Sequence, residues 1–365
     1  MKRLQCACGS QVFFESRDCV RCGARLGFDP ATMSMQSLQP EGDGLYLGAS
    51  GAHYRFCDNA TQWDVCNWLC PAEVCPAEGR PVQECPAEGR PAEAPPAEDS
   101  HPLCFGCQFN RVIPNLSLPG NIQRWWILEQ GKKRLFYTLL SLGLPLVDGW
   151  RDPRNGLLLD FIEDGRSRDD YAETFVSTGF LGGVITINTL EADEVARVAA
   201  REQMNESYRT VLGHLRHESG HYYWSRLWRD SDLRADFAEL FGDETMDYAG
   251  ALARHYREGP SPEWRNYYIS AYASAHPAED WAETWGHYLH IEDALETAAA
   301  YGVTSEDINS LDINARIALW RDLSITLNEL NRSVGRGDAY PFVINSFVES
   351  KLCFVEKAIR RLQTM

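Results

Sequence analysis

The sequence predicts a mainly helical α+β fold that follows small cysteine-bearing modules at the N-terminus. Eleven of the twelve cysteines lie before residue 108, which sets the first third of the chain apart. Two short strand patterns occur between residues 157 and 188, and helical spacing of apolar residues dominates from residue 191 onward. A chain of 365 residues is long enough for two or three domains with a sizeable core.

Composition excludes several classes of protein. The net charge of -17 argues against a general nucleic-acid binder, which needs a basic surface. No run of eighteen or more apolar residues is present, so we expect no membrane span. The N-terminus, MKRLQCACGS, lacks the apolar stretch of a secretory signal. We therefore expect a cytoplasmic protein, in which clustered cysteines bind zinc more often than they form disulfides.

Residues 1–48 have the layout of a zinc ribbon. Two close cysteine pairs, about ten residues apart, would each lie on a tight turn, and their thiols are Cys6, Cys8, Cys19 and Cys22. Gly9 and Gly23 follow the pairs and can adopt the positive φ that such turns need. Residues 12–14 would form the strand between them. The first pair is one residue shorter than the usual C-x-x-C, and an iron–sulfur site or free thiols are the alternatives.

Residues 49–117 predict a second, looser zinc module. Its best ligand set is Cys57, Cys66, Cys104 and Cys107. Residues 70–102 lie between the two halves of this set and repeat Cys-Pro-Ala-Glu units, a composition that cannot bury a core and predicts a mobile inserted loop. Cys70, Cys75 and Cys85 would then be spare thiols. In a rival set Cys70 replaces Cys57, and the repeats could also bind metal themselves.

Residues 118–365 are expected to form one larger domain. Its first helix, residues 125–142, would end at Gly143 and Pro145. Strands are expected at residues 157–162 (LLLDFI) and 182–188 (GGVITIN). Further helices are expected at residues 191–204, 208–228, 232–240, 246–257, 266–274, 278–300, 313–334 and 342–363.

The helix expected at residues 208–228 contains an H-E-x-x-H pattern, His217-Glu218-Ser219-Gly220-His221. Residues four apart lie on one helix face, so His217 and His221 can offer two imidazoles to one metal ion. Glu218 can take a proton from a water whose pKa a zinc ion lowers towards about 7. The pattern is therefore a metalloprotease signature. The alternative, two histidines satisfied in an ordinary core helix, would be costly without a metal or partners.

Two histidines need a third ligand, and the sequence limits where it can be. Trp224 and Leu227 stand where the metzincin class has glycine and histidine, so that class is excluded. The segment 276–290, HPAEDWAETWGHYLH, places Glu279 and Glu283 four residues apart on one helix face. One can bind the metal while the other orients a histidine ligand, and the spacing alone leaves open which does which.

The H-E-x-x-H helix followed by a helix with a ligand glutamate resembles the gluzincin peptidases. The residues AEDWA at 278–282 are similar to the N-E-G-F-A stretch of the aminopeptidase branch, whose glutamate is the third ligand. This resemblance implies that Glu279 binds the metal. The thermolysin-like branch has an orienting acid four residues further on, and this implies that Glu283 orients a histidine.

The whole chain resembles, more closely, the bacterial family of zinc-binding metallopeptidases with an N-terminal zinc-ribbon domain. The segments that carry the resemblance are CVRCGARLGF, TGFLGGVITIN, YRTVLGHLRHESGHYYW, HPAEDWAETWGHYLHI, LNRSVGRGDAYPFVI and the C-terminal EKAIRRL region. The short C-x-C pair and the Cys-Pro-Ala-Glu insert depart from the family pattern. The resemblance implies a zincin-like peptidase domain behind small zinc-ribbon modules, with one catalytic and two structural zinc ions.

The expected function is hydrolysis of a peptide or amide bond by a metal-activated water, with Glu218 as general base. Tyr340 is the candidate donor for the oxyanion, and His276, His287 and Tyr272 are further candidates. A strand directly before the metal helix could be the edge to which an extended peptide substrate adds. The N-terminal modules are expected to dock a protein partner or to shape substrate access.

Two other kinds of function remain open at this point. The chain could be a zinc-ribbon adaptor with an inactive or latent peptidase fold, although the intact H-E-x-x-H residues argue against it. It could also be a nucleic-acid-linked protease, because the first module is locally basic, with Lys2, Arg3, Arg17, Arg21 and Arg25. A toxin or effector protease is a further alternative.

Overall fold

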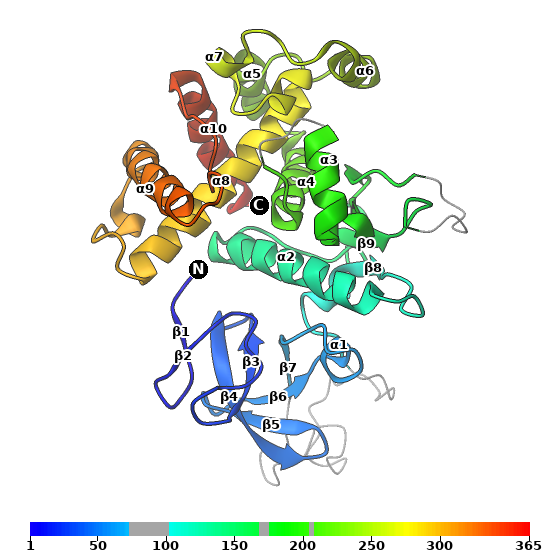
Figure 1. The fold of residues 1–365 in the computed structure, drawn as a ribbon, viewed down its shortest axis with the longest axis vertical. Coiled ribbons are helices and arrows are strands. Elements are labelled where there is room, and N and C mark those ends of the chain that lie inside the picture. Colours follow the sequence, from blue (N-terminus) through cyan, green and yellow to red (C-terminus); the bar gives the residue numbers. More distant parts are fainter. Residues whose placement is uncertain (73–101, 168–174, 204–207) are drawn as a thin grey trace. The chain divides into compact units, whose positions relative to one another are not determined.

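The computed structural model describes residues 1–72, 102–167, 175–203 and 208–365 (Figure 1). The chain divides into two compact units, one built from Arg3–Asn110 and Leu116–Lys133, the other from Met1–Lys2, Arg111–Asn115 and Arg134–Met365. The predicted α+β class, mainly helical and with cysteine modules before the larger domain, is confirmed. Cys75, Cys85 and most of the repeat insert lie outside the described residues, so the mobile loop stays a prediction.

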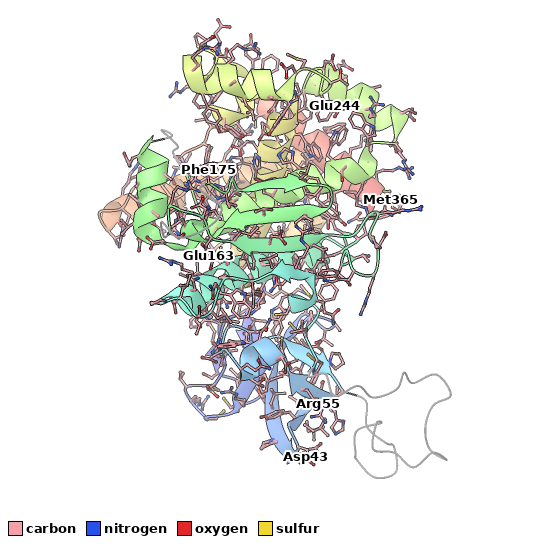
Figure 2. All side chains as sticks on the ribbon, turned by 90° about the vertical axis from the view of Figure 1, so that its right-hand side faces the viewer. Asp43, Arg55, Glu163, Phe175, Glu244 and Met365 are labelled. Atoms are coloured by element: carbon pink, nitrogen blue, oxygen red, sulfur yellow. The ribbon has the colours of Figure 1, made fainter. Side chains whose placement is uncertain are left out.

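The cysteine-bearing unit is mostly antiparallel β-structure. Strands β1 (Leu4–Gln5) and β2 (Gln11–Val12) form one hairpin, and the second sheet has the order β3-β4-β5-β6-β7. Its strands are β3 (Arg25–Asp29), β4 (Ser34–Gly42), β5 (Leu45–Gly48), β6 (His53–Phe56) and β7 (Leu69–Pro71). The short helices α1 (Asp58–Thr61) and η3 (Cys107–Phe109) complete the unit. Arg55 Nη1 donates to the carbonyl oxygen of Asp43 at 2.5 Å and so braces the turn between β4 and β5 (Figure 2).

This sheet crosses the expected boundary at residue 48. Strands β5 and β6 pair antiparallel, with Tyr46 opposite Tyr54, so residues of both expected modules share one sheet. The reason is that residues 48–52 form a tight turn, in which Gly48 accepts from Gly51 N and donates to Ala52 O. Residues 116–133 also cluster with this unit, beyond the expected boundary at residue 117.

The knuckle turns form as expected. Gly9 and Gly23 have φ of +80° and +71°, which confirms the positive φ predicted for them. The strand expected at residues 12–14 is shorter, because the Phe13 carbonyl accepts from Ser16 N in a turn and the Phe13 ring is 65% exposed. The core of the unit is aromatic: the ring of Phe28 lies 4.8 Å from Phe14 and 5.4 Å from Trp68.

The larger unit contains a mixed sheet of order β10-β11-β9-β8. Its strands are β8 (Asn110–Val112), β9 (Leu158–Ile162), β10 (Gly179–Leu181) and β11 (Val184–Asn188). β11 runs parallel to β9 and antiparallel to β10. The strand expected at residues 182–188 begins later, because Gly182 and Gly183, with φ of +57° and +86°, form a two-residue hairpin turn. This turn leads back to β10, an edge strand that was not predicted.

Helices make up most of the remaining described residues, and the first of them divides between the two units at residue 134. They are α2 (Asn121–Ser141), α3 (Glu194–Gln203), α4 (Val211–Leu227), α5 (Ser231–Leu240), α6 (Tyr248–Glu258), α7 (Trp264–Tyr267), α8 (Pro277–Ala300), α9 (Ile313–Ser333) and α10 (Ser346–Leu362), with the short turns η4 (Thr189–Ala192), η5 (Tyr272–Ala275) and η6 (Ile308–Ser310). Most expected helices are found within a few residues of these bounds. Within the described ranges, no helix has the length and apolar character that crossing a bilayer requires.

The helix expected at residues 266–274 was wrong. Helix α7 ends at Tyr267, Tyr268 is extended with φ of -129° and ψ of 150°, and η5 begins only at Tyr272. The Ser270 hydroxyl accepts from Ala273 N at 3.1 Å, which stabilises the turn at the expense of a continuous helix. This break in the helix lets Ser270 reach the candidate site.

Helices α4 and α8 pack tightly against each other, and this crossing positions the site (Figure 1). A Cβ atom added to Gly220 would lie 3.0 Å from the Cα of Ala282, so only glycine allows the approach without a shift. Trp281 Nε1 donates to the Gly220 carbonyl at 2.8 Å, and Trp285 Nε1 donates to Ser219 Oγ at 3.0 Å. Both tryptophans are fully buried, so they fix α8 against the H-E-x-x-H segment.

Candidate functional site

Helix α4 presents the two histidines as the spacing predicted. The helix begins after Thr210, whose hydroxyl accepts from Gly213 N at 2.9 Å. The rings of His217 and His221 lie on one face with centroids 5.0 Å apart. Glu218 is also partly enclosed, with 7% of its surface exposed. Two imidazoles and one carboxylate are thus held by a single regular helix.

Helix α8 brings Glu279 to these histidines. Pro277 occupies its first turn and the His276 ring caps it, as expected for a helix start. Glu279 Oε2 lies 3.0 Å from His217 Nε2, and Oε1 lies 3.6 Å from His221 Nε2. One potential ligand atom from each of these three residues lies within 4.8 Å of the other two. The group has the two-histidine, one-glutamate composition of a zinc site.

Glu283 lies on the other side of the His217 ring. Its Oε1 is 2.8 Å from His217 Nδ1, and its Oε2 accepts from Ser270 Oγ at 2.6 Å. Among the described residues the three-residue ligand group contains Glu279 and leaves out Glu283. The arrangement therefore favours Glu279 as the ligand and Glu283 as the acid that orients His217.

The charges around His217 fit a metal cation. Burial alone would raise the pKa of the Glu279 carboxyl, but His217 and His221 hold it well below its usual value. Glu279 is 1% exposed, and its Oε2 has no hydrogen-bond donor although His217 Nε2 is close. Because Nδ1 of His217 faces Glu283, a neutral ring would turn its Nε2 lone pair towards Glu279. The buried Glu279 oxygen without a hydrogen-bond donor and the two imidazoles fit zinc, which His217, His221 and Glu279 would hold.

A cleft of about 1020 Å³ opens onto this group. His217, Glu218, His221 and Glu279 line it together with the edge strand β10. Tyr248 and Tyr272 lie close to the ligand group, and the Tyr248 hydroxyl donates to Glu279 Oε1 at 2.6 Å. The cleft therefore places the group of His217, His221 and Glu279 beside the edge strand β10.

Tyr340, the expected oxyanion donor, lies elsewhere. It is 2% exposed and is not among the residues that line the cleft. Its hydroxyl lies 2.9 Å from His287 Nδ1, and its ring packs on Trp320 and Phe342. This geometry gives no support to the role predicted for Tyr340, and it instead places Tyr272 at the cleft.

Two residues of the site were missed from the sequence. Tyr248 begins α6 and Ser270 lies in an irregular turn, and neither belongs to a local motif. Both act on glutamates of α8 through contacts that exist only once the chain has folded. No signal of spacing could have indicated them, whereas Tyr272 was among the sequence candidates.

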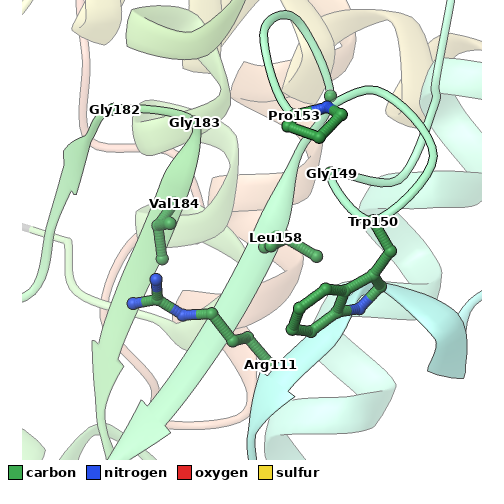
Figure 3. A pocket seen from close by; sticks show the side chains of 9 residues that line it. Arg111, Gly149, Trp150, Pro153, Leu158, Gly182, Gly183 and Val184 are labelled. Atoms are coloured by element: carbon green, nitrogen blue, oxygen red, sulfur yellow. The ribbon is translucent and has the colours of Figure 1, made fainter.

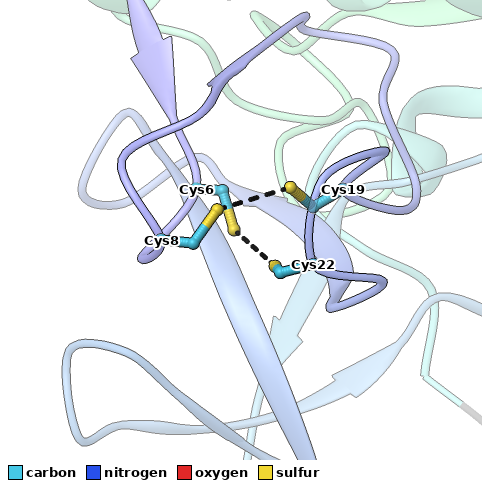
Figure 4. A group of neighbouring side chains, drawn as sticks. All are labelled: Cys6, Cys8, Cys19 and Cys22. Atoms are coloured by element: carbon cyan, nitrogen blue, oxygen red, sulfur yellow. Dashed lines mark hydrogen bonds between the residues drawn. The ribbon is translucent and has the colours of Figure 1, made fainter.

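The first cysteine group comes together around two knuckle turns (Figure 4). Sulfur atoms of Cys6 and Cys22 are 3.6 Å apart, and those of Cys8 and Cys19 are 3.7 Å apart. All four sulfur atoms lie within 4.8 Å of one another. Backbone N–H groups around Cys22 lower the pKa of the Cys19 thiol to about 6, which favours the thiolate that a zinc ion needs.

The second cysteine group is fully buried and consists of Cys57, Cys66, Cys104 and Cys107. Cys66 Sγ lies 3.6 Å from Cys104 Sγ and 3.7 Å from Cys107 Sγ. Cys70, the rival ligand, is not part of this four-sulfur group and instead lies 3.5 Å from the carbonyl oxygen of Pro102. The geometry therefore favours the set with Cys57.

Buried lysines next to this group fit a charged metal site. Lys132 and Lys133 on α2 have no exposed surface, and Lys132 Nζ lies 2.9 Å from the equally buried Glu129. Burial would lower the pKa of Lys133, but the negative charges of Cys66 and Glu129 raise it above its usual value. A zinc ion with four thiolates carries net negative charge, which a buried ammonium compensates.

A separate cavity of about 350 Å³ lies at the turn end of the sheet (Figure 3). Trp150, Leu158 and Gly183 line it with Arg111, whose Nε donates to Asp160 at 2.9 Å. None of its lining residues belongs to the three ligand groups. We assign it no role in the chemistry of the site.

Comparison with known proteins identifies the family. The family described as "Putative zinc-binding metallo-peptidase" matches residues 121–358. The chain belongs to this family. A second description, "zinc-ribbon domain", matches residues 3–85. Uncharacterized proteins of Mycobacterium bovis and of two strains of Mycobacterium tuberculosis are each 35% identical to it over 360 residues, which cover 96% of this chain and 93% of theirs. No solved structure matches it.

These matches confirm the family resemblance predicted from the sequence. The match to the metallopeptidase family contains His217, His221 and Glu279, and the zinc-ribbon match contains the whole first cysteine group. Cys104 and Cys107 of the second group lie beyond the zinc-ribbon match. Zinc binding is thus supported at the level of the family.

Proposed function

We propose that this metallopeptidase uses one zinc ion, held by His217, His221 and Glu279, to hydrolyse a peptide or amide bond. The observation that carries the proposal is the grouping of these ligand atoms within 4.8 Å, in a cleft that Glu218 also lines. Membership of the zinc-binding metallopeptidase family supports it.

The protein residues around the ligands have separate tasks. Zinc bound there supplies a Lewis acid that lowers the pKa of water and polarises a carbonyl oxygen. Glu218 takes a proton from the attacking water and passes it to the leaving amine nitrogen. Its carboxylate lines the cleft next to His217, at the edge of the histidine face. We therefore assign it as the general base.

Glu283, Ser270 and Tyr248 hold the ligands in place. Glu283 accepts from His217 Nδ1 and so keeps the Nε2 lone pair turned to the metal position. Ser270 orients Glu283, and the Tyr248 hydroxyl holds one oxygen of Glu279. This division, with a ligand glutamate and an orienting acid four residues apart on α8, is the gluzincin arrangement that the sequence resembles.

We propose Tyr272, in place of Tyr340, as the donor for the developing oxyanion. Tyr272 lines the cleft, and its ring centroid is 6.0 Å from that of His217. Burial raises the pKa of its hydroxyl well above 10, so it keeps its proton. The Tyr248 hydroxyl already donates to Glu279, which makes it less available.

The edge strand β10 offers a place for the substrate backbone. It is the outermost strand of its sheet, and Gly179, Phe180 and Leu181 all line the cleft. An extended peptide can add to such an edge through backbone hydrogen bonds. We propose that a peptide or protein substrate binds in this way. The two cysteine groups would hold structural zinc, and their modules would serve a protein partner or substrate access.

Metal content tests the three-zinc proposal directly. Elemental analysis should find about three zinc ions per chain in wild type purified without chelator. His217→Ala and the double variant Cys19→Ala, Cys22→Ala should each lose about one. If His217→Ala keeps all its zinc, the α4 group is not a metal site, and an adaptor function becomes the better account.

Activity separates chemistry from metal binding. Glu218→Gln should retain its zinc but hydrolyse a fluorogenic peptide mixture about 10²–10⁴-fold more slowly than wild type, because it lacks the base. Unchanged hydrolysis by this variant would refute the role of Glu218. A wild-type protein that binds zinc at α4 but cleaves no peptide would point to another amide substrate or to a latent enzyme.

A further inference from the structure

One wall of the cleft carries an exposed apolar stripe. Tyr248, Leu252 and Tyr256 follow one another at four-residue spacing on α6, and all three line the cleft. The two tyrosines are 44% and 58% exposed, although aromatic side chains of this size are usually more buried. The stripe therefore suits the apolar side chains of an extended ligand.

The last turn of α4 and the two residues that follow the helix continue the lining beyond the histidines. Beyond His221, the residues Trp224, Ser225, Trp228 and Arg229 line the same cleft. The guanidinium of Arg234 lies 4.2 Å from the centroid of the Trp228 ring, an attractive contact that holds the ring in place. Trp228 is 41% exposed, so part of its ring remains open to a ligand beside Arg229, and we call this ring the Trp228 platform.

Arg229 is the one arginine or lysine among the described residues that line the cleft. It is exposed and forms no hydrogen bond or ion pair with any residue in the described part of the chain. Arg226, on the last turn of α4, does have partners: it donates to the Tyr222 hydroxyl and to the Asn155 carbonyl. A free guanidinium offers a planar set of donors that matches a carboxylate.

The position of Arg229 after His221 sets how many residues of an extended substrate peptide fit between the candidate metal site and Arg229. Arg229 follows His221 by eight positions, and Trp228 at the helix end keeps helical φ and ψ of -51° and -29°. The helical backbone from His221 to Trp228 rises about 10 Å, and Arg229 lies one residue beyond it. An extended peptide covers that length with about three or four residues.

We propose that Arg229, beside the Trp228 platform, is a specificity-determining residue that binds a carboxylate of the substrate about three or four residues from the scissile bond. The inference rests on the proposed peptidase function. The carboxylate can belong to an aspartate or glutamate side chain or to the C-terminus of a peptide. Because Arg229 is the one arginine or lysine among the described residues that line the cleft, it selects for an acidic rather than a basic residue at this position of the substrate.

The test uses the full zinc-loaded chain and a set of internally quenched peptides. Glutamate is placed at each position in turn and compared with glutamine and lysine, with free and with amidated C-termini. Wild type should show about a three- to tenfold higher kcat/KM with a carboxylate at the favoured position, mostly through KM. Arg229→Gln should lose this preference, and Arg229→Glu should prefer lysine there. Arg254→Gln, which removes an exposed α6 arginine outside the cleft lining, is the matched control.

Each outcome decides between the alternatives. A preference that survives amidation assigns the side-chain carboxylate, and one that amidation abolishes assigns the terminal carboxylate. A carboxylate preference that persists in Arg229→Gln, or is lost equally in Arg254→Gln, overturns the inference. If wild type cleaves none of the peptides, the proposed peptidase function is contradicted, but the role of Arg229 in binding a carboxylate is still testable. The same peptides, labelled with fluorescein, are then titrated with zinc-loaded Glu218→Gln, and their fluorescence anisotropy measures binding. The inference requires tighter binding of peptides with the carboxylate, and loss of this preference in the double variant Glu218→Gln, Arg229→Gln.

Discussion

The two nitrogen atoms of His217 face two different carboxylates, and the proposed roles of Glu279 and Glu283 rest on this contact together with the position of His221. Nδ1 lies 2.8 Å from Glu283, and Nε2 lies 3.0 Å from Glu279. With zinc bound, Nδ1 must carry the ring proton and donate it to Glu283, so that the Nε2 lone pair is free for the metal. Glu279 also lies 3.6 Å from His221, whereas Glu283 is not part of the ligand group, and this favours Glu279 as the ligand where sequence spacing left the choice open.

Ser270 is the residue whose removal tests this arrangement most selectively. Ser270→Ala deletes the hydroxyl that donates to Glu283 Oε2 at 2.6 Å, and the loosened Glu283 should orient His217 less well. We expect zinc affinity of the α4 site to fall about tenfold, the lower end of the range for groups that orient metal ligands. Competition with a zinc chelator measures this.

Ser274→Ala provides the control for this change. Ser274 donates to the Ala271 carbonyl and makes no contact with Glu283 that would orient the histidine. Its variant should bind zinc as wild type does. Equal losses in both variants would show that the turn at residues 270–275 matters only for folding.

At the scale of elements, the crossing of α4 and α8 is the critical contact. Gly220→Ala places a Cβ atom 3.0 Å from the Cα of Ala282 and 3.1 Å from the Trp285 ring. The helices must separate, which we expect to lower the free energy of unfolding by about 1–3 kcal/mol and to weaken zinc binding. Denaturant titration, with Gly337→Ala as control because nothing lies within 4 Å of its added Cβ, measures the difference. An unchanged unfolding midpoint would contradict the tight crossing.

The turn that follows β11 is joined to the start of α4 by Glu191. Its carboxylate pairs with Arg209 at 2.5 Å and lies 3.3 Å from His214 Nδ1. Burial would raise the pKa of Glu191, but His214 and Arg209 lower it to about 2. A depressed carboxyl pKa adds stability above the unfolded value of about 4.5, and this stability is lost as the pH falls from there towards 2.

Glu191→Gln should therefore be less stable than wild type at neutral pH, by up to about 3 kcal/mol. The difference in the free energy of unfolding between the two proteins should narrow as the pH is lowered from 5 to 3, since the Glu191 carboxylate of wild type then becomes protonated and loses its stabilising contribution. Denaturant unfolding at each pH provides the measurement. Glu194→Gln, at an exposed position on α3, should show no such narrowing. A constant difference across this range would exclude the ion pair as its source.

At the scale of the whole molecule, local sequence patterns predicted the fold class and the helices better than they predicted where one module ends and the next begins. The class, most helices and the H-E-x-x-H helix follow from periodicity that each segment carries by itself. The pairing of β5 with β6 does not, because it joins residues on both sides of the expected boundary at residue 48 through a turn at residues 48–52. The hairpin of β10 and β11 was missed although Gly182-Gly183 signals it.

In the candidate site, too, contacts within one helix could be predicted from the sequence, whereas contacts between distant segments could not. Residues four apart on a helix meet regardless of the rest of the chain, so His217 and His221 needed no tertiary information. The grouping of Glu279 with them depends on Gly220 and two buried tryptophans. Helix spacing offered Glu279 and Glu283 as candidates, and only the choice of Glu279 came from family resemblance. Ser270 contacts α8 from an irregular turn and Tyr248 contacts it from the start of α6, so no local sequence pattern predicted either contact.

The cysteine-bearing unit should depend on its metal for its fold. Its core is small, and the four thiols of the second group are buried between η3 and the segments before and after α1. Structural zinc contributes about 10 kcal/mol or more to the folding of such small domains. Cys66→Ser should therefore lose one zinc ion and the amide exchange protection of β3–β7. Residues 121–133 of α2, which cluster with this unit, should lose protection too.

Hydrogen exchange with mass spectrometry and elemental analysis test this on the same samples. Protection of α4 and α8 should be retained in Cys66→Ser, because these helices belong to the other compact unit. Cys353→Ser is the matched control, since Cys353 lies on α10 and belongs to neither cysteine group. If Cys66→Ser keeps its zinc, or loses it without any loss of protection in the five-stranded sheet, then the second group does not stabilise the fold through a metal.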